Sequence, residues 1–484
     1  MKRTFSLFAI LALLSASPLS ADLPGGDNQY TANFYVVDQN GTPLQNKQVR
    51  LEVTTWYGDE LNPDYYYCTK LGVTSAQGTV VLSCLIPAEF SEGLVEMQAF
   101  IDEPDYTILE SSDTYTTTVA YIYPYFKIML DLDHNGIGDD WEIQLVEKFK
   151  PGFILNHLTE WVAPEPVEYI GVVKDSLWIQ VYNMLGQEVS DHPISEQNAF
   201  DPPVSVFHAW VNSSNPNWSH VTDTGYPYTG RPPGSAYGSY RLRFHYNYAG
   251  DINNPGGWIN YYQDERQNNN FPHTVYAHFF WHSGKPVIQY WMYYPYNDGY
   301  NNHEADWEHI NVRISDQNPD LATIEMVDFY FHNKVKTMAS GFQLIDGTHP
   351  VVYVGGTCLA VWPPASCEPG EHTGGSYPAA GEWYGVGEWG YNEYVRADGP
   401  VISYQDVLVT ILPEKDDIDY DVHPELSWFK STVRFGYYRS DSPWSFLEEL
   451  PFTSSGSVAG PGPAHHDAWN KVGSEPDGYD NYNQ

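Results

Sequence analysis

The chain has 484 residues, enough for two or three domains that each bury a core of their own. Acidic residues number 62 against 23 Lys and Arg, so the formal net charge is −39 at pH 7. A surface of this charge repels nucleic acid and anionic lipid, because both are bound largely through cationic side chains. We therefore expect no nucleic-acid partner, and a surface that either attracts divalent cations or is simply solvated.

Residues 1–21 have the three parts of a secretory signal peptide. Two cations follow Met1, an apolar run extends from Phe5 to Leu14, and small residues lead to Ala21. The apolar run is too short to span a membrane, and no later segment approaches roughly 18 uninterrupted apolar residues. The mature protein is therefore expected to be soluble and secreted, either extracellular or periplasmic.

Four cysteines lie in the part of the chain that would be exported. Cys68 and Cys84 are close in sequence, and so are Cys358 and Cys367. In an oxidising compartment the simplest pairing is local, 68–84 and 358–367, which leaves no free thiol. The spacings match no zinc pattern.

Residues 22–125 are predicted to form a β-sandwich. The segment "NFYVVDQNGTPLQNKQVRLEVTTW" has two alternating runs joined by an Asn-Gly-Thr-Pro turn, and further short strands follow it. Several short strands within about 100 residues are typical of an antiparallel sandwich. The phrases "VVDQNGTPLQNKQVRLEV" and "SAQGTVVL" resemble bacterial immunoglobulin-like repeats of exported proteins, and this resemblance implies a spacer domain.

Residues 126–149 contain the pattern of a calcium-binding loop followed by a short helix. Positions 1, 3, 5, 7, 9 and 12 of such a loop are held by Asp131, Asp133, Asn135, Ile137, Asp139 and Glu142. Gly136 occupies position 6, where the loop needs a sharp turn. The loop resembles those of thrombospondin type 3 and dockerin repeats. We expect it to bind Ca²⁺ and to fix the joint between two domains; the alternative is an acidic turn.

Residues 150–470 are rich in aromatic residues and poor in helical periodicity. Aromatic content over the whole chain is 16%, which is typical of β-rich proteins and of surfaces that stack on sugars or lie at lipid interfaces. We expect a second, larger antiparallel β-sandwich here, and a disordered tail over residues 471–484. The predicted fold class is thus mainly β.

The motif "HEADWE" lies in a predicted strand of this second domain. Alternation places Asp306 and Glu308 on one face, and Trp307 and His309 on the other. Two neighbouring carboxylates repel each other unless they share a proton or a cation. With His303 and Asp298 as further ligands, the site would suit Mg²⁺, Ca²⁺ or Mn²⁺. The alternative is a set of polar residues at the open end of a sheet.

Other histidines indicate less. His278 and His282 share a strand face and are expected to pack rather than to bind metal, and His465 and His466 are expected on the surface. His372 lies in a Gly-rich loop that could overhang a site. The chain has no GxSxG elbow and no Walker loop.

Two resemblances concern the second domain. "QYWMYYPYNDGYNNHEADWEHINVRI", "HPVVYVGG" and "GEWYGVGEWG" resemble the family of the vacuolar protein sorting-associated protein sixty-two, over about residues 145 to 470. "HEADWE" is remotely similar to the signature of necrosis- and ethylene-inducing-like proteins, which are secreted β-sandwich cytolysins that dock on sphingolipid head groups through a divalent metal.

In the second resemblance, His303, Asp306 and Glu308 match the metal-binding members of the signature. Trp307 matches its Trp, and Asp298 is a loose match to an upstream Asp. The signature's Gly, Arg and second His are replaced by Asn302, Glu304 and Ala305. These replacements concern lipid specificity more than metal binding.

Three functions are compatible with these features. The first is a secreted, metal-dependent binder of membrane glycolipid that is able to lyse membranes. The second is a non-catalytic adhesin or binder of extracellular glycan. The third is a metal-dependent hydrolase or lyase of an exported polymer, with His309 or His372 as proton shuttle, although alternation places His309 on the face opposite Asp306.

Overall fold

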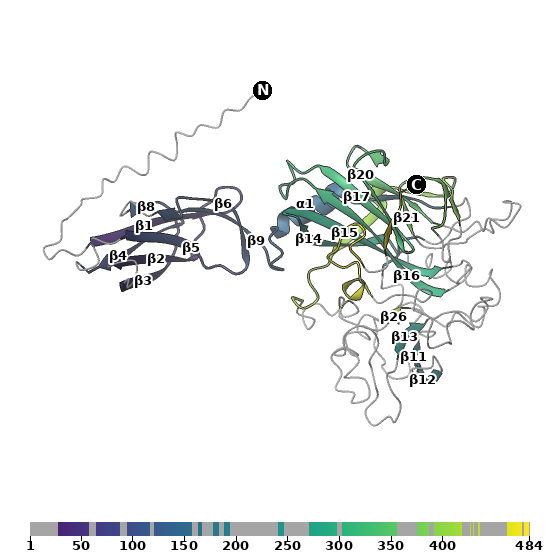
Figure 1. The fold of residues 1–484 in the computed structure, drawn as a ribbon, viewed down its shortest axis with the longest axis horizontal. Helices are drawn as coiled ribbons and strands as arrows, with labels where there is room; N and C mark the ends of the chain where they lie inside the picture. The colour runs from purple at the N-terminus through teal and green to yellow at the C-terminus, as the bar shows by residue number, and fades with distance from the viewer. Residues whose placement is uncertain are drawn as a thin grey trace, which may run out of the picture. The chain divides into compact units, whose positions relative to one another are not determined.

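Figure 1 shows the computed structural model of the chain. It describes residues 28–57, 64–87, 94–116, 121–156, 163–166, 178–182, 188–193, 241–245, 271–297, 303–355, 375–386, 392–418, 426, 429, 434–435, 462–476 and 479–483. The predicted signal peptide, Asp298, His372 and the predicted 358–367 disulfide lie outside these residues. No helix in the described ranges is both long and apolar enough to cross a membrane.

The chain divides into two compact units, Met1–Asp139 and Asp140–Gln484. The division falls within the segment 126–149, where the sequence predicts a joint. The described residues contain one α-helix, α1 (Asp139–Phe149), which begins at the last residue of the first unit. Strands make up most of the rest, as a mainly β fold requires.

The first unit is a sandwich of two sheets, seen in Figure 1 as the purple and blue strands. One sheet has the order β4 (Thr79–Ile86), β1 (Asn28–Val37), β9 (Tyr125–Leu130) and β6 (Tyr106–Ser112), with β8 (Tyr121–Ile122) also paired to β1. The other has the order β3 (Asp64–Val73), β2 (Gln48–Tyr57), β5 (Leu94–Ile101) and β7 (Tyr115–Thr116). Because β9 completes the first sheet, the sandwich extends past residue 125 to Leu130.

Alternation of apolar and polar residues produces the core of this sandwich. Ala32, Phe34 and Val36 of β1 face inward and are fully buried, and β2 contributes every second residue in the same way. Cys68 of β3 and Cys84 of β4 form a disulfide, as predicted, with their Cα atoms 6.0 Å apart. The disulfide joins the edge strand of one sheet to the edge strand of the other.

Within its described residues, the second unit contains a seven-stranded sheet and three smaller sheets. The large sheet has the order β25 (Val407–Ile411), β14 (His273–His282), β15 (Lys285–Asn297), β16 (His303–Ile314), β17 (Ile324–Phe331), β18 (Lys334–Met338) and β27 (Asp480–Asn481). A five-stranded sheet has the order β19 (Leu344–Ile345), β20 (His349–Val354), β10 (Gly152–Ile154) and β24 (Val401–Ile402), with β21 (Ser376–Tyr377) paired to β20. The others are β12 (Glu188–Pro193), β11 (Trp178–Tyr182), β13 (Arg241–His245) and β26 (Arg434–Phe435), and the hairpin of β22 (Gly381–Trp383) and β23 (Glu393–Val395).

The large sheet is antiparallel from β14 to β18, as expected, whereas its two outer pairs, β14–β25 and β18–β27, are parallel. Its central strands are buried on both faces. Tyr290, Trp291, Tyr293 and Tyr294 of β15 are the largest fully buried side chains among the described residues. Burial on both faces explains why β15 is apolar almost continuously rather than at alternate positions.

The end of the chain differs from the prediction of a disordered tail over residues 471–484. Asp480 and Asn481 form β27 beside β18, and the backbone N–H of Tyr482 donates to the carbonyl of Val335 at 2.8 Å. The Tyr482 ring is buried against Phe331 and Trp383. The prediction was wrong because it rested on the polar composition of this segment. The segment is ordered by contacts with β17 and β18, which are distant in the sequence.

Two candidate metal sites

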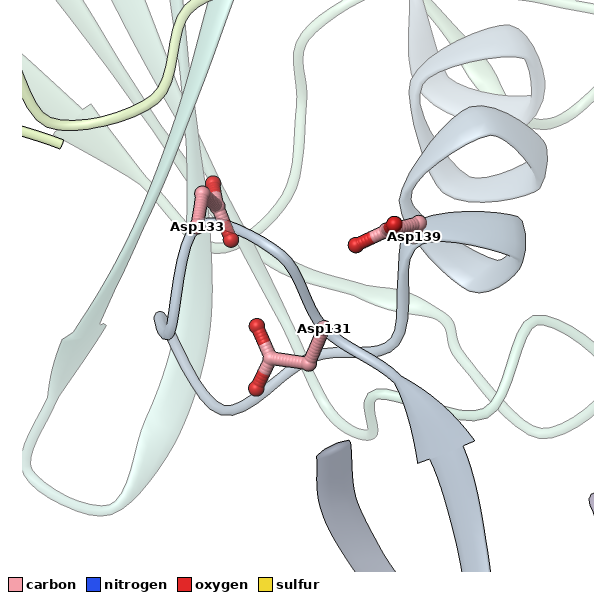
Figure 2. Close-up of side chains that lie close together, drawn as sticks. All are labelled: Asp131, Asp133 and Asp139. Carbon is pink, nitrogen blue, oxygen red and sulfur yellow. The ribbon is translucent and has the colours of Figure 1, made fainter. Parts of the chain in front are cut away.

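The loop between β9 and α1 brings three carboxylates together. Oxygens of Asp131, Asp133 and Asp139 all lie within 4.8 Å of one another, and Figure 2 shows them directed toward a common space beside the start of α1. This is the only group of three or more possible ligand side chains found in the described parts of the chain. The sequence predicted all three residues at loop positions 1, 3 and 9.

The loop holds this shape through its own hydrogen bonds. The N–H of Gly136 donates to Asp131 Oδ2 at 3.0 Å, and the N–H of Leu132 donates to Asp139 Oδ1 at 3.0 Å. Gly136 has a φ of +87°, a conformation that glycine adopts readily because it has no Cβ. The predicted turn at position 6 is therefore present.

The buried charge of this loop fits a bound cation. Asp131 is only 4% exposed, and its Oδ1 atom is buried without a hydrogen-bond partner. Burial raises the pKa of Asp131, and burial together with the charge of Asp131 raises the pKa of Asp133 to about 7. A hard divalent cation held by these oxygens would supply the missing partner and neutralise the repulsion.

The remaining predicted ligands of the loop are placed differently. The Asn135 side chain is engaged inside the loop, because its Oδ1 accepts the N–H of Ile137 at 2.9 Å and its amide donates to Asp133 Oδ2 at 2.9 Å. Glu142 is buried on α1 and is not a member of the three-carboxylate group. The structure thus brings together three of the six predicted residues through their side chains.

The second predicted site lies on β16. Asp306 stands opposite Tyr294 and Glu308 opposite Met292 in the register with β15, and both carboxylates are half-buried. Trp307 and His309 are buried on the other face. His303 begins β16 with its backbone opposite Asn297, its side chain being outside what the structure describes.

The surroundings of Glu308 are rich in carboxylates. Burial raises the pKa of Glu308 well above its usual value, the charge of Asp306 and then that of Glu393 raise it further, and His332 and the backbone of Gly375 oppose the shift. A carboxylate in such surroundings is stabilised by either a proton or a cation. The described residues at this position do not form a three-ligand group, so Asp306 and Glu308 are the two candidate ligands that they supply.

Three further residues lie close to Glu308 or to one another at this position, and the sequence analysis did not single them out. His332 follows β17, and its Nε2 lies 2.5 Å from Glu393 Oε1 on β23. The hydroxyl of Tyr377, on β21, donates to the other oxygen of Glu393. These residues come from separate strands, and no local pattern around any of them marks a site, so only the tertiary structure could reveal them.

The opposite face of the large sheet carries a different group of histidines. The His309 ring stacks between Trp291 at 4.3 Å and Tyr330 at 3.9 Å, and burial lowers its pKa well below the usual value. His309 therefore lies away from the Asp306 face, as alternation predicted. His278 is also buried, and its Nδ1 lies 2.9 Å from the carbonyl of Leu412.

His466 corrects the expectation that the pair at 465–466 lies on the surface. Both side chains are partly buried, and the His466 ring packs edge-on against Trp291 at 5.1 Å. Burial, aided by the charge of Lys471, lowers the pKa of His466 to about 4. The local sequence "GPAHHDAWN" is polar, and its packing depends on the distant β15.

Comparisons with known proteins give limited similarity. No family model and no curated protein matches the chain. Among solved structures, the non-toxic HaNLP3 protein is 16% identical with a TM-score of 0.23, over 55% of this chain and 74% of its own. Necrosis and ethylene inducing protein 2, from the causal agent of cocoa's witches' broom disease, is 13% identical with a TM-score of 0.21, over 55% and 72%.

A third structure, NLPPya in complex with mannosamine, is 16% identical with a TM-score of 0.19, over 32% of this chain and 56% of its own. The structural neighbours thus include necrosis- and ethylene-inducing proteins, at low identity and low TM-score. Scores this low establish neither a shared fold nor a shared site.

Proposed function

We propose that this chain is a secreted protein that binds a glycolipid surface through a divalent cation at Asp306 and Glu308, and that binding leads to lysis. The observation that carries the proposal is the pairing of these two carboxylates on one face of β16, with Glu393 adding a third negative charge near Glu308. We expect His303 and Asp298 to complete the ligand set, as the sequence motif predicts.

A cation would also resolve the conflict between the charge of the chain and a membrane target. The formal charge of −39 opposes approach to an anionic bilayer. A divalent ion held by protein oxygens can bind a further oxygen of a sugar hydroxyl or a phosphate, and it offsets the negative charge of the carboxylates at the point of contact. Metal binding and lipid binding should therefore be lost together.

The loop at Asp131 has a separate role in this proposal. Its three carboxylates would hold Ca²⁺ beside the start of α1 and stabilise that segment of the chain. The hydrolase alternative has no support in the described residues, because His309 is buried on the face opposite Asp306 and Glu308. The remaining shuttle candidate, His372, lies outside them.

The first test is calorimetric titration of Mg²⁺, Ca²⁺ and Mn²⁺ into the mature chain with the loop site disabled by Asp131→Asn and Asp133→Asn. Binding should remain in this background and disappear when Asp306→Asn and Glu308→Gln are added. Asp320→Asn is the matched control, since Asp320 is an exposed carboxylate of the same unit. If the cation binding measured by titration is the same after Asp306→Asn and Glu308→Gln are added, the proposed metal site at these residues is wrong.

The second test measures dye leakage from vesicles of phosphatidylcholine with and without a glycosylated sphingolipid. We expect leakage only from the glycolipid vesicles, and its loss with chelator and with the Asp306→Asn, Glu308→Gln variant. Leakage that continues in both conditions would exclude the cation from the mechanism. No leakage from any vesicle would contradict lysis, and co-sedimentation of protein with vesicles would then decide whether binding alone occurs.

A further inference from the structure

The outer face of the sheet β3-β2-β5-β7 in the first unit carries exposed tyrosines. Tyr67 and Tyr65 of β3 are 68% and 52% exposed, and their near-parallel rings lie 6.0 Å apart. Tyr115 of β7, at the opposite edge of the same sheet, is 51% exposed. β3 and β7 are the two edge strands, so the aromatic rings flank the sheet on both sides.

The strand register shows what lies between these rings. Tyr67 is opposite Thr54, which is opposite Glu96 on the next strand. One row further, Thr69, Glu52, Gln98 and Tyr115 follow one another across the four strands. Because residues directly opposite in antiparallel strands share a face, these hydroxyl, carboxylate and amide groups form a polar band between the tyrosines.

The polar band and the tyrosines beside it are called the tyrosine-flanked face, which consists of Tyr65, Tyr67, Thr54, Thr69, Glu52, Glu96, Gln98 and Tyr115. Two contacts hold side chains of this face in place. The Tyr115 hydroxyl donates to Glu96 Oε1 at 3.2 Å, and Arg50 forms an ion pair with Glu52. Three strand spacings separate β3 from β7, which is about 14 Å across the sheet. This span suits a chain-like ligand of a few rings rather than a single small molecule.

We propose that the tyrosine-flanked face binds a neutral oligosaccharide. Sugar rings have apolar C–H faces that pack on aromatic rings, and hydroxyl groups that donate to carboxylates and exchange hydrogen bonds with amides and hydroxyls. The face offers both kinds of group, with polar groups in the middle of the sheet and aromatic rings on its two edge strands. The site lies in the first unit and is independent of the cation site proposed at Asp306 and Glu308.

Charge and polarity favour this ligand over a second copy of the chain. Two copies would bring Glu52 and Glu96 of one face toward those of the other, within molecules that each have a net charge of −39. The centre of the face is also polar, whereas the centre of a self-association surface is usually apolar. A neutral ligand rich in hydroxyl donors meets neither obstacle.

The test is calorimetric titration of the mature chain with cellohexaose, xylohexaose, mannohexaose and chitohexaose. The Asp306→Asn, Glu308→Gln variant serves as a second background, so that binding through the cation site is distinguished from binding here. We expect at least one hexasaccharide to bind in both backgrounds, and the double change Tyr67→Ala, Tyr115→Ala to weaken it at least about tenfold. The change Val81→Ala, Leu85→Ala on β4 is the control, since these side chains are equally exposed on the other sheet.

Thermal unfolding of each variant checks that the first unit stays folded, and Gln98→Ala provides a variant that removes a polar group and leaves all rings in place. Weakened binding by Gln98→Ala supports the proposal independently of the tyrosines. Failure of all four hexasaccharides to bind overturns it, and so does binding that both the tyrosine and the Gln98 variants leave unchanged. Self-association that disappears with Tyr67→Ala, Tyr115→Ala would assign the face to a second copy instead.

Discussion

Asp306 and Glu308 lie on the same face of β16, and the negative charge of Asp306 adds to burial in raising the pKa of Glu308. In the metal-free protein this pair opposes folding at neutral pH, because an acid with a raised folded pKa is ionised more readily in the unfolded chain. The unfavourable contribution develops as pH rises above the unfolded pKa of Glu308. It is the expected property of a pair arranged for a cation rather than for stability.

Asp306→Asn should therefore stabilise the metal-free protein at pH 8 while it abolishes cation binding at this site. Its effect should fade by about pH 3, where the Glu308 carboxyl is protonated in the folded and unfolded states and carries no charge for Asp306 to repel. Urea unfolding in chelator at the two pH values measures this difference. The control Asp320→Asn should have no such pH-dependent effect, and a loss of stability at pH 8 in Asp306→Asn would show that the pair is structural.

The loop at Asp131 should couple calcium to the stability of the first unit. Calcium at about 100 times its dissociation constant is expected to stabilise the folded state by about 2.7 kcal/mol. Asp131→Asn should remove this response, because it eliminates the buried carboxylate that has an unpartnered oxygen. Thermal unfolding with and without calcium measures the effect. Asp140→Asn changes an exposed neighbour, and the calcium response should survive in it.

The two units should respond to acid in opposite directions once Glu308→Gln removes the carboxyl whose raised pKa acts in the same sense as that of Asp133. In the calcium-free first unit the pKa of Asp133 is raised to about 7, so stability falls as pH rises from about 4 to about 7. In the second unit the pKa of His309 and that of His466 are lowered, the latter to about 4. As pH falls, these two histidines bind protons in the unfolded chain at a higher pH than in the folded chain. The free energy of unfolding of the second unit therefore decreases between about pH 6.5 and pH 4.

In the Glu308→Gln variant, hydrogen exchange followed by mass spectrometry separates the two units and checks this prediction. In chelator, amides of β1 and β2 should be better protected at pH 5 than at pH 7, after correction for the intrinsic exchange rate. Amides of β15 and β16 should be better protected at pH 7. His466→Phe should reduce the acid sensitivity of β15. Parallel changes in both units would contradict the opposite signs derived from these groups.

The sequence correctly predicted those features that are determined by residues close together in the chain. Alternation in "DWEHINVRI" placed Asp306 and Glu308 opposite to His309, because side chains in any strand alternate whatever the sheet around it. The spacing of Asp131, Asp133 and Asp139 likewise lies within one loop. Each of these features is determined over fewer than ten residues, and the structure agrees with each of them.

Features that depend on distant partners could not be predicted from the same sequence. Glu393 reaches His332 across 61 positions of the chain, and neither residue lies in a recognisable motif. The polar end of the chain has a composition typical of disorder, yet Gly473 donates its N–H to Asp328 from 145 positions away. Contacts between residues so far apart depend on the order of strands in the sheet. No short stretch of sequence indicates them.

The Cys68–Cys84 disulfide should stabilise the first unit by constraining its unfolded chain. The two cysteines are 16 residues apart, and a loop of this length corresponds to about 3 kcal/mol in the chain-entropy model. Replacing both cysteines by Ala should lower the free energy of unfolding of this unit by about that amount. Urea unfolding followed by exchange at β1 measures it. Reductant should reproduce the effect in the wild-type chain and have none in the variant's first unit.

Asn311 should hold the segment 466–473 on the large sheet. Its amide nitrogen donates to the carbonyl of Lys471 at 2.9 Å and to the Tyr330 hydroxyl at 3.1 Å, and its oxygen accepts from Gln289 at 3.0 Å. Gln289 in turn donates to the carbonyl of Ala468 at 2.9 Å. The bonds among Asn311, Gln289, Tyr330 and Ala468 are buried and that to Lys471 is partly buried, so the apolar isostere in Asn311→Leu would leave several of these groups unpaired.

Asn311→Leu is therefore expected to lower the free energy of unfolding of the second unit by about 1–3 kcal/mol for each group left unpaired. Exchange protection in segment 466–473 should fall before that of β15, because the segment is bound to the sheet through these amides. Asn333→Leu is the matched control, since Asn333 is exposed at the turn between β17 and β18. Equal protection of the segment in wild type and Asn311→Leu would show that ring packing alone retains it.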